Sequence, residues 1–513
     1  MANPAIASEA APGVKDETLP IQDAEAAASS SKSTNGRAEQ VAQATVLAVL
    51  FAVPALMCAH AACVTDPDIW WHLRAGEWIL AHHAVPQVDP FSYSLVGKPW
   101  QAYSWLFELV TIKLFYRLGL AGIVTYTSGM VLAVTVSMVH LVKRLQGDFS
   151  LAVLLTFAAV YSMGRLYTPR PWLFTVLFFI LELDILMQAR RTGRARELLW
   201  LPLVFALWAN VHIEFIDGLL VLGLAFVESV AARWWSGAQT RVGPKWMGAV
   251  LVASGLATLV NPYGWRVYSV VFDYSSRLAA AGSALNRVSE LQAMPFRAPG
   301  DFLILLLAMA SAAALAWRRF PLFESGLLIF AAFTSFRSQR DVWVIAVAAA
   351  AILASTIAGS EKTAIRLPMG ATALAMLVAG LAVLAGFRGM GVNNAQLETQ
   401  LAKSLPVSAV EAIRVKGYAG PLYNDYDWGG YLMWAQRMPV SIDGRASFYG
   451  DQRIDRSVAT WNAEPDWATD AQLTSAGVVI GPVKAPLNQL LRMDPRFQLV
   501  YEDKLAAVFV ARR

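Results

Sequence analysis

Long apolar stretches separated by short polar ones dominate the chain between residues 41 and 388. Eleven of these stretches are long enough, or nearly so, to cross a bilayer, because a membrane-spanning helix needs ~20 apolar residues and ~17 at the least. They cover residues 43–63, 120–142, 148–163, 170–188, 198–213, 215–232, 246–262, 301–317, 320–336, 341–358 and 367–387. The pattern predicts a polytopic α-helical membrane protein with about eleven transmembrane helices.

A further apolar run, residues 101–118, decides the topology. It contains Glu108, Lys113 and Arg117, so it is amphipathic enough to lie on the membrane surface. Basic clusters mark the cytoplasmic ends of spans. The five clusters are Lys143–Arg144, the arginines of 190–196, Arg233 with Arg241 and Lys245, Arg318–Arg319, and Lys362 with Arg366. All five fall inside the cell if the N-terminus is cytoplasmic and 101–118 does not span, and we predict that topology.

Composition divides the chain into three parts. Of its residues, 56% are apolar and only 15% are charged, against about 25% charged in an average soluble domain. Residues 1–40 are rich in Ala and Ser and are predicted to be a disordered cytoplasmic tail. Residues 41–388 are predicted to be the transmembrane domain, with a first outer loop at 64–119 that carries surface helices and a long outer loop at 263–300. A soluble enzyme, a disulfide scaffold and a disordered protein are thereby excluded.

Residues 389–513 form the third part, predicted to be an extracytoplasmic α/β domain. They carry 13 acidic and 13 basic residues. We expect helices over 396–416 and 485–492, and strands at 420–424, 438–445, 477–481, 497–502 and 505–511. No P-loop and no Rossmann glycine fingerprint occurs in the sequence, so nucleotide binding is unsupported. The net charge of +5 arises in the membrane part, where it reports orientation, and no nucleic-acid partner is expected.

The strongest local feature in the outer loops follows the first span, at Asp66-Pro67-Asp68, with His72 one helical turn further on. Either aspartate could act as a general base on an acceptor hydroxyl. The two together could hold a divalent metal such as Mg or Mn through oxygen ligands; no other cofactor is indicated. The structural alternative is that Asp66 only caps the Trp-rich helix that follows it.

Arginines form the second feature. Arg165 and Arg170 lie on one predicted outer loop, with Tyr167 between them, and Arg337 and Arg340 lie on another. A guanidinium binds phosphate oxygens with two parallel hydrogen bonds, so these four arginines are candidates for a phosphate site. The alternative is that they anchor helix ends at the membrane interface. A third outer loop adds His212 and Glu214, although a lone histidine is more often structural than catalytic.

These features together resemble the GT-C class of integral-membrane glycosyltransferases, and most closely the catalytic subunits of oligosaccharyltransferases. The first outer loop of those subunits carries an Asp-Pro-aromatic segment followed by Arg and Glu, as Asp66, Pro67, Arg74 and Glu77 do here. Their outer domain carries Trp-Trp-Asp-Tyr-Gly and then Asp-Gly. The counterparts here are Asp427-Trp428-Gly429-Gly430-Tyr431 and Asp443-Gly444.

Two departures narrow the resemblance. The order of the outer-domain motif differs, and Arg165 and Arg170 stand where that family has an acidic pair in its second loop. The chain is therefore more similar to members of the class that transfer a single sugar from a polyprenyl phosphate. The resemblance implies a GT-C-like bundle and an inverting transferase of the bacterial plasma (inner) membrane. Its donor would be a polyprenyl-phosphate sugar and its acceptor a glycan, a lipid or a protein.

The resemblance also implies roles for individual residues. Asp68, Asp66 and His72 are the expected catalytic residues, and Arg165, Arg170, Arg337 and Arg340 are expected to hold the donor phosphate. Asp427, Trp428, Asp443 and Arg445 are expected to bind the acceptor. Two other functions stay open at this stage. A transporter would use carboxylates inside the spans, such as Glu182 and Asp184, and a non-catalytic assembly protein would use the outer domain to bind a partner.

Overall fold

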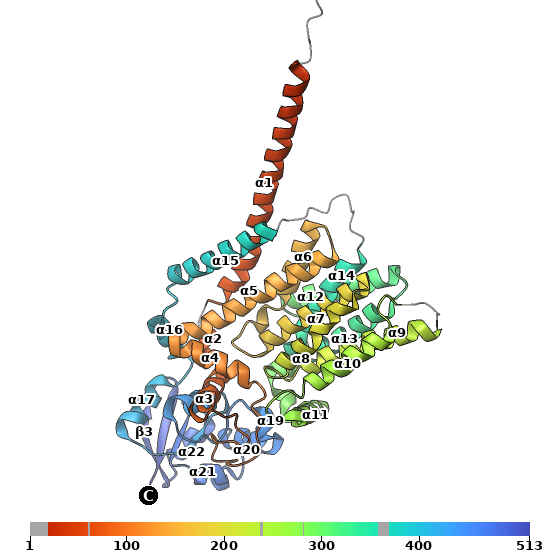
Figure 1. The fold of residues 1–513 in the computed structure, drawn as a ribbon. Coiled ribbons are helices and arrows are strands. Elements are labelled where there is room, and N and C mark those ends of the chain that lie inside the picture. Colours follow the sequence, from red (N-terminus) through yellow and green to blue (C-terminus); the bar gives the residue numbers. More distant parts are fainter. Residues whose placement is uncertain (1–18, 60–61, 236–239, 281, 358–368, 513) are drawn as a thin grey trace, which may run out of the picture.

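A helical bundle and a smaller C-terminal domain make up the molecule (Figure 1). The computed structural model describes residues 19–59, 62–235, 240–280, 282–357 and 369–512. The start of α1 (Leu19–Met57) and the C-terminal domain lie at opposite ends of the bundle in Figure 1. This arrangement agrees with a chain whose two ends lie on opposite sides of a membrane.

The bundle packs its helices side by side. Besides α1 it contains α5 (Leu120–Leu145), α6 (Phe149–Ser162), α7 (Trp172–Thr192), α8 (Leu201–Trp208), α9 (Phe215–Trp235), α10 (Pro244–Ala257), α12 (Pro299–Trp317), α13 (Leu322–Arg337), α14 (Val342–Thr356) and α15 (Met369–Gly389). Helix α14 lies at the centre, and every residue from Val342 to Ala354 is buried. Its small side chains, mostly Ala and Val, allow neighbouring helices to approach closely.

Seven helices in the described part are long and apolar enough to cross a membrane by length and composition. The other four predicted spans correspond to the shorter helices α6, α8, α10 and α13. The clearest shortening is at 198–213, where a 3-10 turn (Ala195–Trp200) leads into α8 and Pro202 stands in its first turn. Proline favours such a start because its missing N–H is not needed there. The number of crossings stays a prediction.

The N-terminal tail differs from expectation where it is described. Residues 1–18 lie outside the described part, and from Leu19 onward the backbone is helical and continuous with the first span. The composition of residues 1–40 predicts disorder up to residue 40. The alanines at 24–28 explain the difference, because alanine has the highest intrinsic helix propensity.

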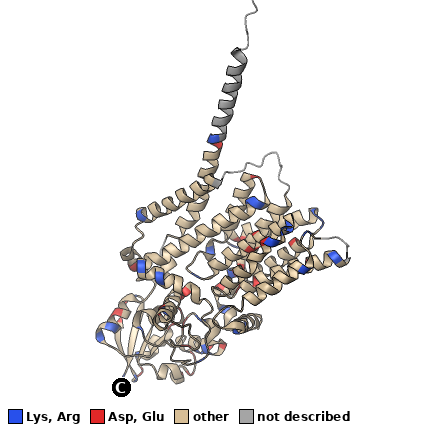
Figure 2. Cartoon of the chain, in the orientation of Figure 1, with Lys and Arg blue, Asp and Glu red and all other residues tan. Residues whose placement is uncertain are grey.

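Basic residues gather at the end of the bundle that faces away from the C-terminal domain (Figure 2). Three of the five predicted clusters contact one another there: Arg191 donates to the backbone carbonyl of Arg144 at 2.8 Å, and Arg241 donates to the carbonyl of Arg191. Lys362 and Arg366, the fifth cluster, lie outside the described residues. A shared end for these clusters is what the predicted topology requires.

The C-terminal domain has one mixed sheet. Its strand order is β1-β2-β4-β3, with β1 and β2 parallel and the other pairs antiparallel. The elements are α16 (Asn394–Leu401), α17 (Val407–Lys416), β1 (Leu422–Asn424), α18 (Gly429–Gln436), α19 (Ala446–Tyr449), α20 (Asp451–Trp461), α21 (Ala471–Thr474), β2 (Val478–Pro482), α22 (Pro486–Leu491), β3 (Phe497–Glu502) and β4 (Ala506–Ala511). The predicted α/β character is therefore present.

Two predicted elements of this domain are wrong in detail. The single helix expected over 396–416 is two helices, because Pro406 stands at the N-cap of α17 and cannot continue the first helix. Residues 438–445 are not a strand, although Val440 makes isolated bridges to Ser92 and Leu422. This segment pairs with the first outer loop as well as with the sheet, which a pattern within the domain could not reveal.

The C-terminal domain docks on α3 (Pro67–His82), the helix that follows the first span. Trp70 packs edge-on against Tyr431 of α18, with ring centroids 5.1 Å apart. A β-carbon on Gly430 would stand 2.7 Å from the Pro67 carbonyl oxygen, so only glycine permits this approach. Helix α4 (Trp105–Leu118), the predicted surface helix, packs against the same α3 and against α5. The start of α3 is therefore held from the domain side and from the bundle side.

Candidate functional site

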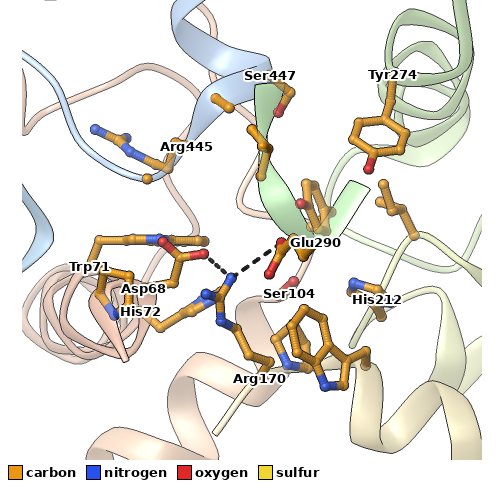
Figure 3. Close-up of a pocket in the computed structure, with 18 of the residues that line it drawn as sticks. Asp68, Trp71, His72, Ser104, Arg170, His212, Tyr274, Glu290, Arg445 and Ser447 are labelled. Atoms are coloured by element: carbon orange, nitrogen blue, oxygen red, sulfur yellow. Dashed lines mark hydrogen bonds and ion pairs between the residues drawn. The ribbon is translucent and has the colours of Figure 1, made fainter. Parts of the chain in front are cut away.

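A cavity of about 290 Å³ lies where the outer loops of the bundle meet the C-terminal domain. Its walls come from α3, the 100–104 segment, the α6–α7 loop, the 285–291 segment and the 426–447 part of the C-terminal domain (Figure 3). The charged and histidine residues of its lining are Asp68, His72, Glu108, Arg170, His212, Glu290, Arg340, Asp427 and Arg445. Segments far apart in the sequence thus supply one polar cavity.

Asp66 and Asp68 are placed by the start of α3. Asp66 is the N-cap, and its Oδ1 accepts a hydrogen bond from the Asp68 amide at 2.9 Å. The N-cap alternative is therefore confirmed for Asp66, but the same carboxylate also pairs with Arg170. Asp68 and His72 stand four residues apart, on the same face of a helix, and both line the cavity.

Arg170 connects three carboxylates. Its Nε lies 3.0 and 2.9 Å from the two oxygens of Asp66, and its Nη1 donates to Asp68 and lies 3.9 Å from Glu290. Figure 3 shows the guanidinium between Asp68 and Glu290. The Arg170 carbonyl accepts a hydrogen bond from the Tyr126 hydroxyl at 3.0 Å. Pro171 and Trp172 follow at once, where α7 begins, so both ends of this residue are fixed.

A second cavity, of about 230 Å³, shares a wall with the first. The shared residues are Arg170, Trp172, Ser289, Glu290 and Arg340, and the second cavity adds Asp66, Arg165, Leu166, Thr168 and Gln339. The guanidinium carbons of Arg170 and Arg340 lie 5.1 and 5.2 Å from the centre of the Trp172 ring, within cation–π range. Three arginines thus line the second cavity.

Arg340 has an unused donor. Its Nη2 lies 3.3 Å from Glu214 and 3.4 Å from the Nε2 of His212, and its Nη1 lies 3.9 Å from Glu290. Its Nε is buried and has no hydrogen-bond partner among the described residues. A buried N–H without a partner is costly, so the side chain of Arg340 lacks one of the hydrogen bonds that usually compensate its burial.

The other predicted arginines and Tyr167 are placed differently. Arg165 lines the second cavity but its Nη2 donates to buried Asp301. Arg337 lines neither cavity, and its Nη2 donates to the Leu278 carbonyl at 3.1 Å. Tyr167 donates to the Val160 carbonyl at 2.5 Å and also stands outside both linings. Through these contacts Arg165, Arg337 and Tyr167 hold the loops in place.

Burial shifts the pKa values of the acidic residues that line the larger cavity. Burial raises the pKa of Asp68 to about 7, and the neighbouring Asp66 and Glu290 charges add to this although Arg170 opposes it. Burial likewise raises the pKa of Glu108 to about 8. Glu108 stands 3.3 Å from the Nδ1 of His72, whose pKa is lowered well below its ordinary value by burial and by the charge of Arg170. Groups with such shifts in a cavity are candidates for proton transfer.

The predicted acceptor residues of the outer domain divide into two pairs. Asp427 and Arg445 line the larger cavity, whereas Trp428 and Asp443 are buried outside its lining. Arg445 donates to Asp443 at 2.7 Å and to Asp89 of the first outer loop at 2.7 Å. Both carboxylates are fully buried, so this network joins the outer loop to the domain.

The Asp66 and Asp68 pair does not fit a metal in this arrangement. No group of three or more His, Cys, Asp or Glu side chains that could hold a metal ion occurs in the part of the chain that the structure describes. The space between the two carboxylates is taken by the Arg170 guanidinium, which contacts both. A cation placed there would have to displace a side chain whose backbone is held by Tyr126.

The sequence missed several lining residues, chiefly Glu290, Tyr274 and the aromatic residues Trp71, Trp100 and Trp172. Glu290 and Tyr274 belong to the long outer loop, which has no strong apolar pattern. The one available signal was that Glu290 is the sole acidic residue between 278 and 300. In the membrane part, Glu182 is buried and neither of its oxygens has a hydrogen-bond partner among the described residues, whereas Asp184 pairs with Arg144.

Comparisons with known proteins agree with this architecture. The sequence matches no protein-family model and no curated protein. Among solved structures, the oligosaccharyltransferase of Archaeoglobus fulgidus in the apo form is similar, with a TM-score of 0.57 and 11% identity over 85% of this chain and 70% of that one. The same enzyme, AglB, in complex with an inhibitory peptide and a dolichol-phosphate gives a TM-score of 0.56 at 11% identity, over 85% and 69%.

A weaker likeness extends over more of the chain. ArnT from Cupriavidus metallidurans, bound to undecaprenyl phosphate, aligns with 90% of this chain and 97% of its own at 13% identity, with a TM-score of 0.49. The likeness to the archaeal oligosaccharyltransferase shows the fold. The chain has the fold of the GT-C class of integral-membrane glycosyltransferases, as the sequence predicts.

Proposed function

We propose that the protein is a membrane glycosyltransferase that moves a sugar from a polyprenyl-phosphate donor to an acceptor at the extracytoplasmic face. The observation that carries the proposal is the pair of cavities that share a wall containing Arg170, Glu290 and Arg340. Each cavity is lined by three arginines, but Arg445 of the larger cavity is paired with Asp89 and Asp443. The smaller cavity therefore suits a phosphate better. The other holds a carboxylate with a raised pKa, as a general base requires.

The donor phosphate occupies the smaller cavity in this proposal. Arg340, Arg170 and Arg165 line this cavity and bring three positive charges to it. The lipid chain would extend from there toward the bundle. The dolichol-phosphate bound to the structurally similar AglB supports a lipid-linked phosphate as the ligand class.

The acceptor hydroxyl enters the larger cavity. Asp68 takes the hydroxyl proton while the acceptor oxygen attacks the anomeric carbon of the donor sugar. The bond between that carbon and the phosphate oxygen breaks, and the lipid phosphate leaves with its negative charge stabilised by Arg170 and Arg340. Attack opposite to the leaving group inverts the anomeric centre. Asp66 keeps Arg170 in place, and His72 orients the acceptor beside Asp68.

The acceptor itself contacts the outer domain through Asp427 and Arg445, and Trp428 and Asp443 support these two by packing and pairing. Aromatic residues Trp71, Trp100 and Tyr426 surround the same space. A cavity that mixes aromatic faces with carboxylates suits a polyhydroxylated acceptor, because sugar C–H faces stack on rings while hydroxyls donate to carboxylates. A glycan, a lipid or a protein could each present such a group. The setting is the bacterial plasma (inner) membrane, with the N-terminus in the cytoplasm.

The test uses the purified full-length protein in nanodiscs with polyprenyl phosphates that carry different radiolabelled sugars. Transfer of label to an acceptor, or release of polyprenyl phosphate, is the expected result with at least one donor. Binding of donors without any turnover would instead support an assembly protein. Movement of a solute across proteoliposomes, which buried Glu182 could assist, would support a transporter.

A further inference from the structure

The Asp66, Asp68 and Glu290 carboxylates converge on one covalently attached cation. Two of them come from the segment after the first span, and the third comes from the long outer loop some 220 residues later in the chain. Their common neighbour is the Arg170 guanidinium, at 2.9 Å from Asp66, in direct contact with Asp68 and at 3.9 Å from Glu290. The Arg170 side chain is only 12% exposed. We propose that Arg170 is the resident cation of this site and that the site works without a bound divalent metal.

The chemistry of the oxygens leads to this proposal. Carboxylate oxygens that converge from separate loops are the ligands that Mg²⁺ and similar ions take. Here the same oxygens accept N–H donors: Nε lies within 3.0 Å of both Asp66 oxygens, and Nη1 faces Asp68. A guanidinium is planar, always charged and rich in donors. It can therefore neutralise and orient several carboxylates in the way that a metal ion does.

The anchoring of Arg170 indicates that the guanidinium is fixed and does not swing in and out. Its carbonyl accepts from Tyr126, its guanidinium lies 5.1 Å from the Trp172 ring centre, and Pro171 follows it directly. Proline restricts the backbone of the residue before it. A metal that entered between the carboxylates would have to break these contacts as well as the ion pairs.

The net charge of the site predicts what happens when Arg170 is removed. Three carboxylates and one guanidinium carry a formal charge of −2. Arg340, which pairs with Glu290, offsets part of this negative charge. Removal of Arg170 leaves three converging carboxylates without their cation. As they stand, these side chains do not form a metal site, but without the guanidinium between them they can turn toward one ion. Such a variant should acquire a divalent ion, because the number of charged oxygen ligands tunes affinity in such sites. The proposal rests on the proposed function only for the statement that Arg170 also faces the donor phosphate.

The experiment measures Mn²⁺ binding to the purified full-length protein in detergent by electron paramagnetic resonance, without donor or acceptor. Wild type is expected to bind no stoichiometric Mn²⁺ at this site. Arg170→Ala is expected to gain one Mn²⁺ per chain, at least ~10-fold tighter than any wild-type binding. Adding Asp66→Asn and Asp68→Asn to that variant should remove the new site. Arg165→Ala is the matched control and should gain nothing, because its loss exposes a single carboxylate, Asp301.

One tightly bound Mn²⁺ per wild-type chain that Asp68→Asn removes would overturn the proposal, and this holds even if Arg170→Ala does not fold. A second readout is sugar transfer by wild type after exhaustive chelation, which should be unchanged. Transfer that returns only when a divalent ion is added back would overturn the resident cation and leave the proposed function intact. A protein that transfers no sugar under any condition would contradict the proposed function, and the Mn²⁺ measurement would still decide the role of Arg170.

Discussion

Asp66 combines a local structural role with a role in the site. Its Oδ1 caps α3 by accepting the Asp68 amide, and both of its oxygens accept from Arg170. The two roles are compatible because a carboxylate has about four acceptor positions. From sequence, the cap and the site appeared as alternatives. The cap sets where Asp68 stands, and the ion pair sets where Arg170 stands, so Asp66 links the proposed base to the proposed cation.

Asp68 should give the transfer reaction a pH dependence near neutrality. Burial raises its pKa to about 7, and a general base accepts a proton only when it is ionised. As the pH rises from 6 to 8, Asp68 loses its proton, so kcat/KM should rise. Below pH 7 most of the enzyme has a protonated Asp68, so kcat/KM should be low. The measurement is kcat/KM against pH. A rate that stays flat over this range, or that rises near pH 4 as an ordinary aspartate would predict, contradicts the assignment.

Replacement of Arg340 should mainly weaken the affinity for the donor. One charge-assisted hydrogen bond contributes ~1.5–3 kcal/mol, so Arg340→Ala should weaken donor binding by roughly one to two orders of magnitude. Arg340→Lys should recover part of this, because the charge remains and the planar fork is lost. Arg337→Ala is the matched control on the same loop and should bind donor like wild type. Equal affinity for all of these variants would make Arg340 an interfacial anchor.

At the scale of elements, the contact between α3 and the C-terminal domain builds the site. Gly430 allows α18 to approach the Pro67 carbonyl, and Gly444 stands directly against the Asp68 carboxylate. The motif similar to that of oligosaccharyltransferases thus includes the glycines that let the domain approach Pro67 and Asp68. The sequence singled out this motif for acceptor binding, and its packing role became visible only in three dimensions.

Gly444→Ala should therefore damage transfer. An added β-carbon would overlap the Asp68 Oδ1, so the carboxylate or the 443–446 segment would have to move. A displacement of about 1 Å in a catalytic group can cost ~100-fold in rate, and we expect a loss of ~10- to 100-fold with donor binding retained. Gly255→Ala on α10 is the control, since nothing lies within 4 Å of its added carbon. Equal activity of both variants would show that the contact is not needed.

Over the whole molecule, the sequence pattern correctly predicts the features that depend only on residues close to one another in the chain. The spacing of Asp68 and His72 on one helix, the loop position of Arg170 and the α/β character of the last domain all follow from short-range rules. The positions of Glu290, Tyr274 and Glu108 do not, because each reaches the cavity through tertiary packing of a different segment. The assignment of the cytoplasmic and outer faces likewise depends on whether 101–118 crosses the membrane. Only the positions of the basic clusters favour one answer over the other.

Cysteine labelling tests this topology in intact cells. Arg194 follows α7 of the bundle and Met493 follows α22 of the C-terminal domain, and both side chains are exposed, whereas both native cysteines are buried. Arg194→Cys should react with a membrane-impermeant maleimide only after the membrane is opened, whereas Met493→Cys should react from outside. The reverse pattern would invert the molecule and remove the site from the outer face.

Donor binding and donor turnover, measured in one preparation of wild type and Asp68→Asn, test the central claim most directly. The account predicts that both proteins bind the polyprenyl-phosphate sugar with similar affinity, melt at similar temperature, and differ in turnover, which only wild type performs. Asp68→Asn keeps the shape of the side chain and removes its ability to accept a proton at neutral pH. Turnover by Asp68→Asn at the wild-type rate would contradict the account.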